Sequence, residues 1–235
     1  LFRSLAAMLR SLAKRRCLGE DIPEQATEFN VLVIGSMYMS HNNIDTVLNG
    51  ITLEADNVQT NVTFIRDDKF TFIQLATEGS VTDLALAEVI GEKTWDAVIL
   101  QLTRRMTRSD LSVEAGEKAA LEQIINGKLK DYKDKIYLFT LNGTAGPTIY
   151  SVEDGVYKNT GNKEPAEIST IEYNAAYYAE VACAWAKEFN LKTILYGSTY
   201  SSDLTSAEIG YLKACCAYMS LFGEEVPETD RKSVV

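Results

Sequence analysis

The clearest pattern in the sequence is a short apolar run, Asn30 to Ile34, that is rich in β-branched residues and is broken by Gly35. A run of this length bounded by glycine is typical of a buried β-strand. The next apolar positions recur at intervals of three and four residues, which predicts an amphipathic helix; they are Ile44, Val47, Leu48 and Ile51. The residues between, Ser36 to Asn43, therefore form a strand-to-helix loop. In parallel sheets such loops are where ligands and catalytic side chains collect.

The same alternation of strand and helix patterns continues along the chain. Further strands are predicted at Thr60–Arg66, Trp95–Leu102, Lys135–Leu141 and Thr193–Tyr196. Helices are predicted at Asp83–Ile90, Val113–Ile125, Pro165–Phe189 and Ala207–Phe222, whereas Lys69–Thr77 fits either type. This order predicts an α/β three-layer sandwich with a mostly parallel, five-stranded, flavodoxin-like sheet. We expect one such domain over residues 29–235, preceded by a helix and linker over residues 1–28.

Two later stretches refine this picture. Residues 142–163 contain glycines, a proline and many polar residues, which predicts a long loop of the kind used for binding or gating. Pro165 is expected to open the following helix, whose apolar stripe runs from Ile168 to Phe189. The tyrosines and tryptophan of that stripe are interpreted as core residues.

The charge distribution divides the chain unevenly. The first sixteen residues hold five of the 23 basic residues and no acid, so the rest carries 18 basic against 33 acidic residues. An acidic body repels phosphate backbones, which argues against a nucleic-acid partner. Leu1–Arg16 is predicted to be a basic amphipathic helix that docks on the acidic body or on a neighbouring subunit, giving a homo-oligomer; a helix lying on a membrane surface is the alternative.

Neither a cofactor nor a membrane span is expected. The four cysteines, Cys17, Cys183, Cys215 and Cys216, lack paired metal-binding spacing, and we interpret them as reduced, buried apolar residues. No apolar run approaches the length of a transmembrane helix. The chain does not begin with Met, so we expect a processed, trimmed or partial product that is soluble and either cytoplasmic or exported.

Polar residues gather after several of the predicted strands: Ser36 to His41, Gln101 with Arg104, Asn142, and the stretch around Asp203. The segments Val31-Leu-Val-Ile-Gly-Ser-Met-Tyr38, Trp95-Asp-Ala-Val-Ile-Leu-Gln101 and Asp203…Gly210-Tyr-Leu…Phe222-Gly223 resemble the SGNH/GDSL hydrolase superfamily, in particular a bacterial branch of unknown function. The resemblance spans about residues 30–223. It implies the fold described above and, in active members, a serine ester hydrolase.

The catalytic motifs of that superfamily are altered in this chain. Members carry Gly-Asp-Ser or Gly-Asn-Ser after the first strand, and aligning on Gly35 puts Ser36 in the Asp/Asn slot and Met37 in the slot of the nucleophile. The late Asp-x-x-His motif retains Asp203, but no histidine follows it. Because a thioether cannot attack a carbonyl and an unassisted serine is a poor nucleophile, the resemblance predicts a catalytically degenerate protein.

Three functional hypotheses follow. The first is a degenerate hydrolase that binds a small anionic, glycan or acyl ligand in the old active site, through Ser36, Met37, Tyr38, Gln101, Arg104, Asn142 and Thr205. The second is an active esterase or carbohydrate deacetylase with a rebuilt triad of Ser36 or Ser40, His41 and Asp203. The third is an assembly module that uses the amino-terminal helix.

The ligand hypothesis depends largely on three arginines in the acidic body, Arg104, Arg105 and Arg108. A guanidinium group suits a carboxylate or phosphate ligand. The alternative is local pairing of these arginines with Asp110, Glu114 and Glu117 on the following helix.

Overall fold

The computed structural model describes residues 26–39, 43–196 and 205–223. These residues fall into two compact units, which we describe separately. One contains residues 26–29, 43–61 and 205–223, and the other contains residues 30–39 and 62–196. The predicted amino-terminal helix, Ser40, His41 and Asp203 lie outside the described residues, so the proposed division at residue 28 and the oligomerisation role of the helix stay predictions.

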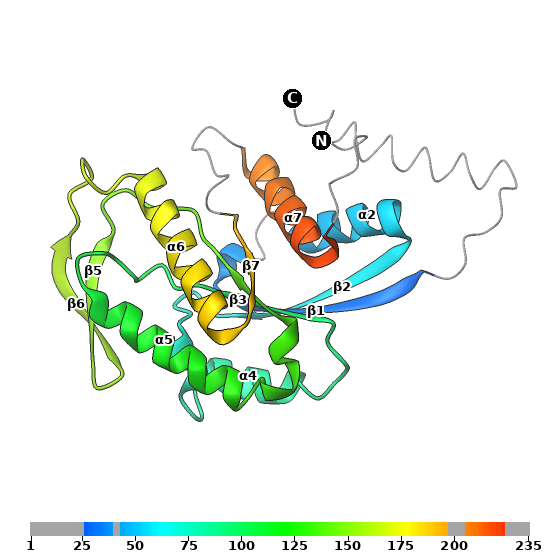
Figure 1. The fold of residues 1–235 in the computed structure, drawn as a ribbon, viewed down its shortest axis with the longest axis horizontal. Helices are drawn as coiled ribbons and strands as arrows, with labels where there is room; N and C mark the ends of the chain where they lie inside the picture. Colours follow the sequence, from blue (N-terminus) through cyan, green and yellow to red (C-terminus); the bar gives the residue numbers. More distant parts are fainter. Residues whose placement is uncertain (1–25, 40–42, 197–204, 224–235) are drawn as a thin grey trace, which may run out of the picture. The chain divides into compact units, whose positions relative to one another are not determined.

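The fold is organised on a five-stranded sheet with strand order β2-β1-β3-β4-β7 (Figure 1). Its strands are β1 (Thr27–Gly35), β2 (Val58–Arg66), β3 (Ala97–Gln101), β4 (Ile136–Phe139) and β7 (Lys192–Ile194). The pairings of β1 with β3, β3 with β4 and β4 with β7 are all parallel. The predicted α/β class with a mostly parallel sheet of five strands, flanked by helices, is confirmed. The first strand is interior, as a ligand-bearing β1 loop requires.

The larger unit packs its helices on one hydrophobic core. They are α3 (Phe72–Ala76), α4 (Val81–Val89), α5 (Leu111–Asn126) and α6 (Ile171–Phe189). Two 3-10 helices also belong to this unit: η1 (Met37–Met39) follows β1, and η2 (Lys130–Lys135) follows α5. Leu32, Leu100 and Leu138 of the sheet share this core with Leu121 of α5 and Trp185 of α6. The interpretation of the α6 aromatic stripe as core is therefore confirmed, because Tyr178 and Trp185 are also almost fully buried.

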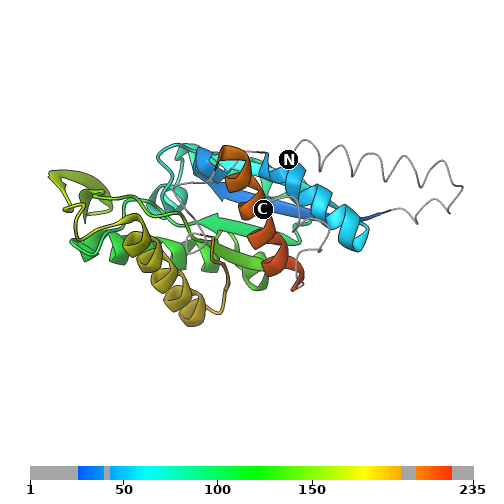
Figure 2. The ribbon, with the colours of Figure 1, turned by 90° about the horizontal axis from the view of Figure 1, so that it is seen from above.

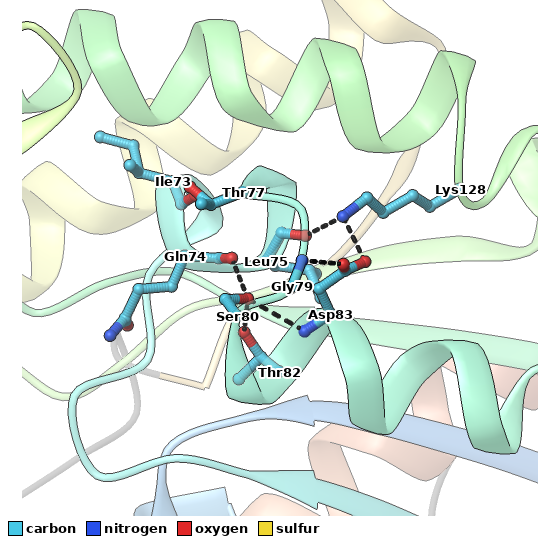
Figure 3. A network of polar contacts seen from close by, with 9 residues as sticks. All are labelled: Ile73, Gln74, Leu75, Thr77, Gly79, Ser80, Thr82, Asp83 and Lys128. Atoms are coloured by element: carbon cyan, nitrogen blue, oxygen red, sulfur yellow. Dashed lines mark hydrogen bonds and ion pairs between the residues drawn. The ribbon is translucent and has the colours of Figure 1, made fainter.

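A polar network holds the α3–α4 turn against the end of α5 (Figure 3). Lys128 Nζ donates to the backbone oxygen of Leu75 over 2.7 Å and forms an ion pair with Asp83. The other carboxylate oxygen of Asp83 accepts from Gly79 N at 2.8 Å. The hydrogen bond from Lys128 lowers the pKa of Asp83 most strongly. Ser80 caps α4 by accepting from Asp83 N, and its hydroxyl donates to Gln74 O.

Two sequence-based expectations in the larger unit are wrong. The stretch predicted to be a long loop contains an antiparallel hairpin, β5 (Thr148–Glu153) with β6 (Val156–Lys163). The helix expected to open at Pro165 begins at Ile171, because the Thr170 side chain caps it by accepting from Tyr173 N. Pro165 instead opens a separate turn, in which its carbonyl accepts from Ser169 N at 3.0 Å.

The smaller unit contains α2 (Ile44–Asp56) and α7 (Ser206–Phe222), which lie side by side (Figure 1, Figure 2). Phe29 contacts Phe222 of α7, with ring centroids 5.0 Å apart. Asn57 ends α2 in the left-handed conformation, and its N–H bonds to Thr52 O. Both helices correspond to predicted ones.

The cysteine prediction is only partly correct. Cys215 is buried, as expected, but Cys183 is exposed and Cys216 is only half-buried. Within the described ranges, no helix is both long and apolar enough to cross a membrane.

Candidate functional site

Ser36 and Gln101 meet at the carboxyl ends of β1 and β3. The parallel register that pairs Ile34 with Leu100 places Gly35 beside Gln101, whose side chain reaches over the glycine toward Ser36. The Ser36 N–H donates to Gln101 Oε1 at 2.8 Å, and Ser36 Oγ lies 3.0 Å from Oε1 and 2.9 Å from Nε2. Ser36 and Gln101 are 6% and 1% exposed. The serine hydroxyl is thus buried and engaged by an amide.

Gly35 is required by this arrangement. A Cβ at residue 35 would lie 2.5 Å from Gln101 Oε1 and 2.7 Å from Gln101 Cβ. The carbonyl of Gly35 also accepts from Asp67 N at 3.0 Å, which fixes the end of β1 against the residue after β2. The glycine therefore provides space for the amide that bonds Ser36.

Met37 and Tyr38 follow in η1 and lie at the surface. They are 37% and 43% exposed, whereas Met39 is buried and its N–H bonds to Ser36 O at 3.0 Å. Met37, which the motif resemblance puts in the slot of the nucleophile, is therefore a partly exposed residue.

Arg104 lies at the same end of the sheet, three residues after β3. Its guanidinium carbon is 4.7 Å from the centre of the Tyr38 ring, a cation–π contact, and its Nη2 donates to Thr144 Oγ1. Tyr178 O–H donates to the backbone oxygen of Arg104 at 3.2 Å. Among the described residues, no carboxylate lies within ion-pair distance of Arg104.

The loop after β4 contributes Thr144, the residue that accepts from Arg104, to this cluster. Asn142 is half-buried, and Gly143 is pressed against α6, where a Cβ would lie 1.8 Å from Ile171 O. The backbone oxygen of Thr144 accepts from Asn174 Nδ2 at 2.6 Å. The sequence singled out Asn142 but missed Thr144 and Asn174. The sequence did contain a signal for Asn174, because this polar residue lies on the apolar, buried face of the predicted helix.

The other two arginines make aromatic contacts, and neither forms an ion pair with Asp110, Glu114 or Glu117, although the charge of Arg105 acts on Glu117. Arg105 stacks on Tyr157 of the hairpin, with its guanidinium carbon 4.6 Å from the ring centre. Arg108 lies over Tyr173 and Tyr177 and pairs with Glu180 at 2.6 Å. The expected partners bind elsewhere: Asp110 caps α5, Glu114 accepts from Tyr177, and Glu117 accepts from Tyr157.

Glu117 is a fully buried carboxylate that ties the hairpin to the core. It accepts from Phe72 N at 2.8 Å, from Ile73 N at 3.2 Å and from Tyr157 O–H at 2.5 Å. Burial raises the pKa of Glu117, and these hydrogen bonds together with the nearby Arg105 charge oppose the rise only in part. With no solvent exposure, this carboxylate holds structure together and is not accessible to a substrate.

The remaining predicted site residues are Thr205, His41 and Asp203. Thr205, in the smaller unit, forms a capping box at the start of α7: its Oγ1 and N–H both donate to Glu208, and Glu208 N donates back to the hydroxyl. His41 and Asp203 lie outside the described residues, so a rebuilt triad stays a prediction. Over the part of the chain that is described, no group of three metal-ligating side chains occurs.

Comparisons with known proteins give structural likenesses but no sequence match. No protein-family model matches the sequence, and no curated protein matches it. Among solved structures, the chain is similar to a protein described as "a putative SGNH hydrolase from Slackia heliotrinireducens". The likeness has a TM-score of 0.48 and 13% identity, and it covers 83% of this chain and 100% of that chain. At these values it assigns neither an activity nor a site residue to this chain.

Proposed function

We propose that this protein is a catalytically degenerate relative of the SGNH/GDSL hydrolases, and that it binds a small anionic ligand at the carboxyl ends of β1 and β3. The motif resemblance puts Met37 in the slot of the nucleophile. Support for the loss of catalysis comes from Ser36, whose buried hydroxyl lies within 3.0 Å of both polar atoms of Gln101. An amide is too weak a base to take the proton of a hydroxyl, so the contacts with Gln101 do not activate Ser36 for attack.

The observation that carries the binding proposal is the state of Arg104. Its guanidinium is held by the Tyr38 ring on one face and by the Thr144 hydroxyl, and no described carboxylate neutralises it. A guanidinium has five N–H donors in a fixed fork. One is used on Thr144, which leaves the others for a bidentate carboxylate or phosphate.

The neighbouring surface suggests the rest of the ligand. Tyr38 lies against the guanidinium and is 43% exposed, and Met37, the residue before it in η1, is 37% exposed. Aromatic and thioether groups suit an acyl chain or the carbon face of a sugar. An acidic sugar or a short acyl carboxylate therefore fits better than a bare inorganic ion.

Calorimetric titration with three probes tests the proposal: glucuronate, glucose as its neutral counterpart, and inorganic phosphate. Glucuronate is expected to bind and glucose is not. Arg104→Gln should weaken glucuronate binding by about tenfold to a hundredfold, because a hydrogen bond to a charged group contributes roughly 1.5–3 kcal/mol.

The matched control is Arg108→Gln, which removes a partly exposed arginine that already has Glu180 as its partner. This variant should bind glucuronate as the unmodified protein does. Absence of glucuronate and phosphate binding, or equal binding by Arg104→Gln, would refute an anion site at Arg104. Tighter binding of phosphate than of glucuronate would refute the preference for a carboxylate.

A further inference from the structure

A chain of buried hydrogen bonds runs from the Arg104 site into the turn that precedes α6. Asn174 is 2% exposed, and its side-chain nitrogen lies 2.6 Å from Thr144 O, 2.7 Å from Ser169 Oγ and 3.1 Å from Thr170 O. An amide has two protons, so the two shorter contacts are the principal bonds. Asn174 thereby joins the residue that holds Arg104 to the buried Ser169.

The chain ends on a buried carboxylate. Ser169 O–H donates to Glu164 Oε2 at 2.8 Å, and Glu164 is 5% exposed. The other oxygen of Glu164 accepts from Ser109, from its N–H at 3.0 Å and from its hydroxyl at 2.5 Å. Asn174 donates to Ser169, and Ser169 donates to Glu164, so every hydrogen bond in this series points toward the carboxylate.

We infer that Asn174, with Ser169 and Glu164 behind it, is a positioning residue that orients Arg104 for an anionic ligand by fixing the Thr144 hydroxyl. This inference rests on the proposed function for its ligand, but the orientation of Arg104 can be measured without one. Asn174 holds the backbone of Thr144, and Thr144 holds one guanidinium nitrogen. A long side chain that is already ordered in the free protein loses less conformational entropy when the ligand binds.

The same loop is braced on both sides, which explains why one amide can set its position. Gly146 N donates to Ser169 O at 3.0 Å, and Glu164 N donates to Pro147 O at 3.0 Å. Gly143 lies so close to the first turn of α6 that a side chain would not fit. Of these braces, the Asn174 side chain is the one that reaches Thr144 itself.

The test is nitrogen-15 NMR of the arginine side chains in the ligand-free protein. Arg104 is assigned as the signal lost in Arg104→Lys, and Arg108, held by Glu180, is the internal control. Slow rotation of the Arg104 guanidinium is expected in the unmodified protein. In Asn174→Leu and in Thr144→Val the rotation should become at least several-fold faster, with the Arg108 signal unchanged, and Thr144→Ser should restore slow rotation.

Glucuronate titration of the same variants gives the second readout. Asn174→Leu and Thr144→Val should weaken binding at least fivefold, and Thr144→Ser should stay within twofold of the unmodified protein. Unchanged Arg104 rotation in Thr144→Val, or in a folded Asn174→Leu, would overturn the inference while leaving the anion site standing. If Asn174→Leu does not fold, Asn174→Ala takes its place, and unchanged Arg104 rotation in that variant would overturn the inference. Failure of the unmodified protein to bind glucuronate would refute the proposed function, whereas the rotation measurements would still decide the role of Asn174.

Discussion

Replacing Gly35 by alanine should break the hydrogen bonds between Ser36 and Gln101 and destabilise the protein. The new Cβ would lie 2.5 Å from Gln101 Oε1 and 2.7 Å from Gln101 Cβ. The oxygen can rotate away, but the Cβ is fixed by the backbone of the central strand β3. The strand must therefore shift or the glutamine must leave, and leaving removes the acceptor of the buried Ser36 N–H.

The magnitude follows from these two costs. Overpacking a well-packed interior costs about 1–3 kcal/mol, and an unsatisfied buried donor costs about 1–3 kcal/mol. The lower chain entropy of unfolded alanine returns roughly 0.4–1 kcal/mol. The Gly35→Ala protein should thus lose about 2–4 kcal/mol in free energy of unfolding. With a urea slope of about 2 kcal/mol per molar, the midpoint should fall by roughly 1–2 M.

Equilibrium urea unfolding, followed by the fluorescence of the two buried tryptophans Trp95 and Trp185, measures this directly. The matched control is Gly91→Ala, because a Cβ at Gly91 meets nothing within 4 Å and its φ is not in the left-handed region. That variant should be as stable as the unmodified protein or slightly more stable. Equal midpoints for Gly35→Ala and Gly91→Ala would refute the contact between Gly35 and Gln101.

Two further predictions concern charged groups outside the site. Lys128→Met should lower the free energy of unfolding by about 1–3 kcal/mol at neutral pH, because it leaves Asp83 and a backbone oxygen without their donor. The pKa of Asp83 is lowered in the folded protein, so its contribution to stability is present above pH 3.8 and is lost as the pH falls through the folded-state pKa. The difference in stability between Lys128→Met and the unmodified protein should therefore shrink in acid. A difference that grows in acid would contradict the ion pair. Glu117 behaves in the opposite sense: its folded-state pKa is raised, so its stabilisation is complete below 4.5 and declines as the pH rises through the folded value. Urea unfolding between pH 4 and 7 should show the unmodified protein losing stability relative to Glu117→Gln as the pH rises. The reverse trend would show that the hydrogen bonds from Tyr157 and the α3 amides stabilise the charged carboxylate by more than its burial destabilises it.

Much of the fold was predictable because its signals are local. The buried strands are short β-branched runs ended by glycine or polar residues, and the helices α5 and α7 have regular apolar spacing. The hairpin was missed because β6 is almost wholly exposed and contains Lys158-Asn-Thr-Gly-Asn-Lys163, a composition typical of loops. Its only strand signal is the alternation of Tyr150 and Val152, which pack on the core.

The candidate site was predictable in outline and not in its bonds. Strand ends identified Ser36, Gln101 and Arg104, because carboxyl ends of parallel strands share one edge. The pairing of Ser36 with Gln101 depends on the register of β1 against β3, which periodicity does not encode. The Thr144–Asn174 contact joins residues 30 positions apart through a turn that the sequence suggested was part of a helix.

The most direct test of the proposed loss of catalysis is labelling with a serine-directed fluorophosphonate, followed by peptide mass spectrometry. Hydrolysis of a short-chain nitrophenyl ester is assayed beside it. With Ser36 Oγ bonded to Gln101 and Met37 in the slot of the nucleophile, we expect no adduct on any serine and no turnover above the buffer rate. An adduct on Ser36 or Ser40, accompanied by ester hydrolysis, would contradict the account and favour an active esterase with a rebuilt triad.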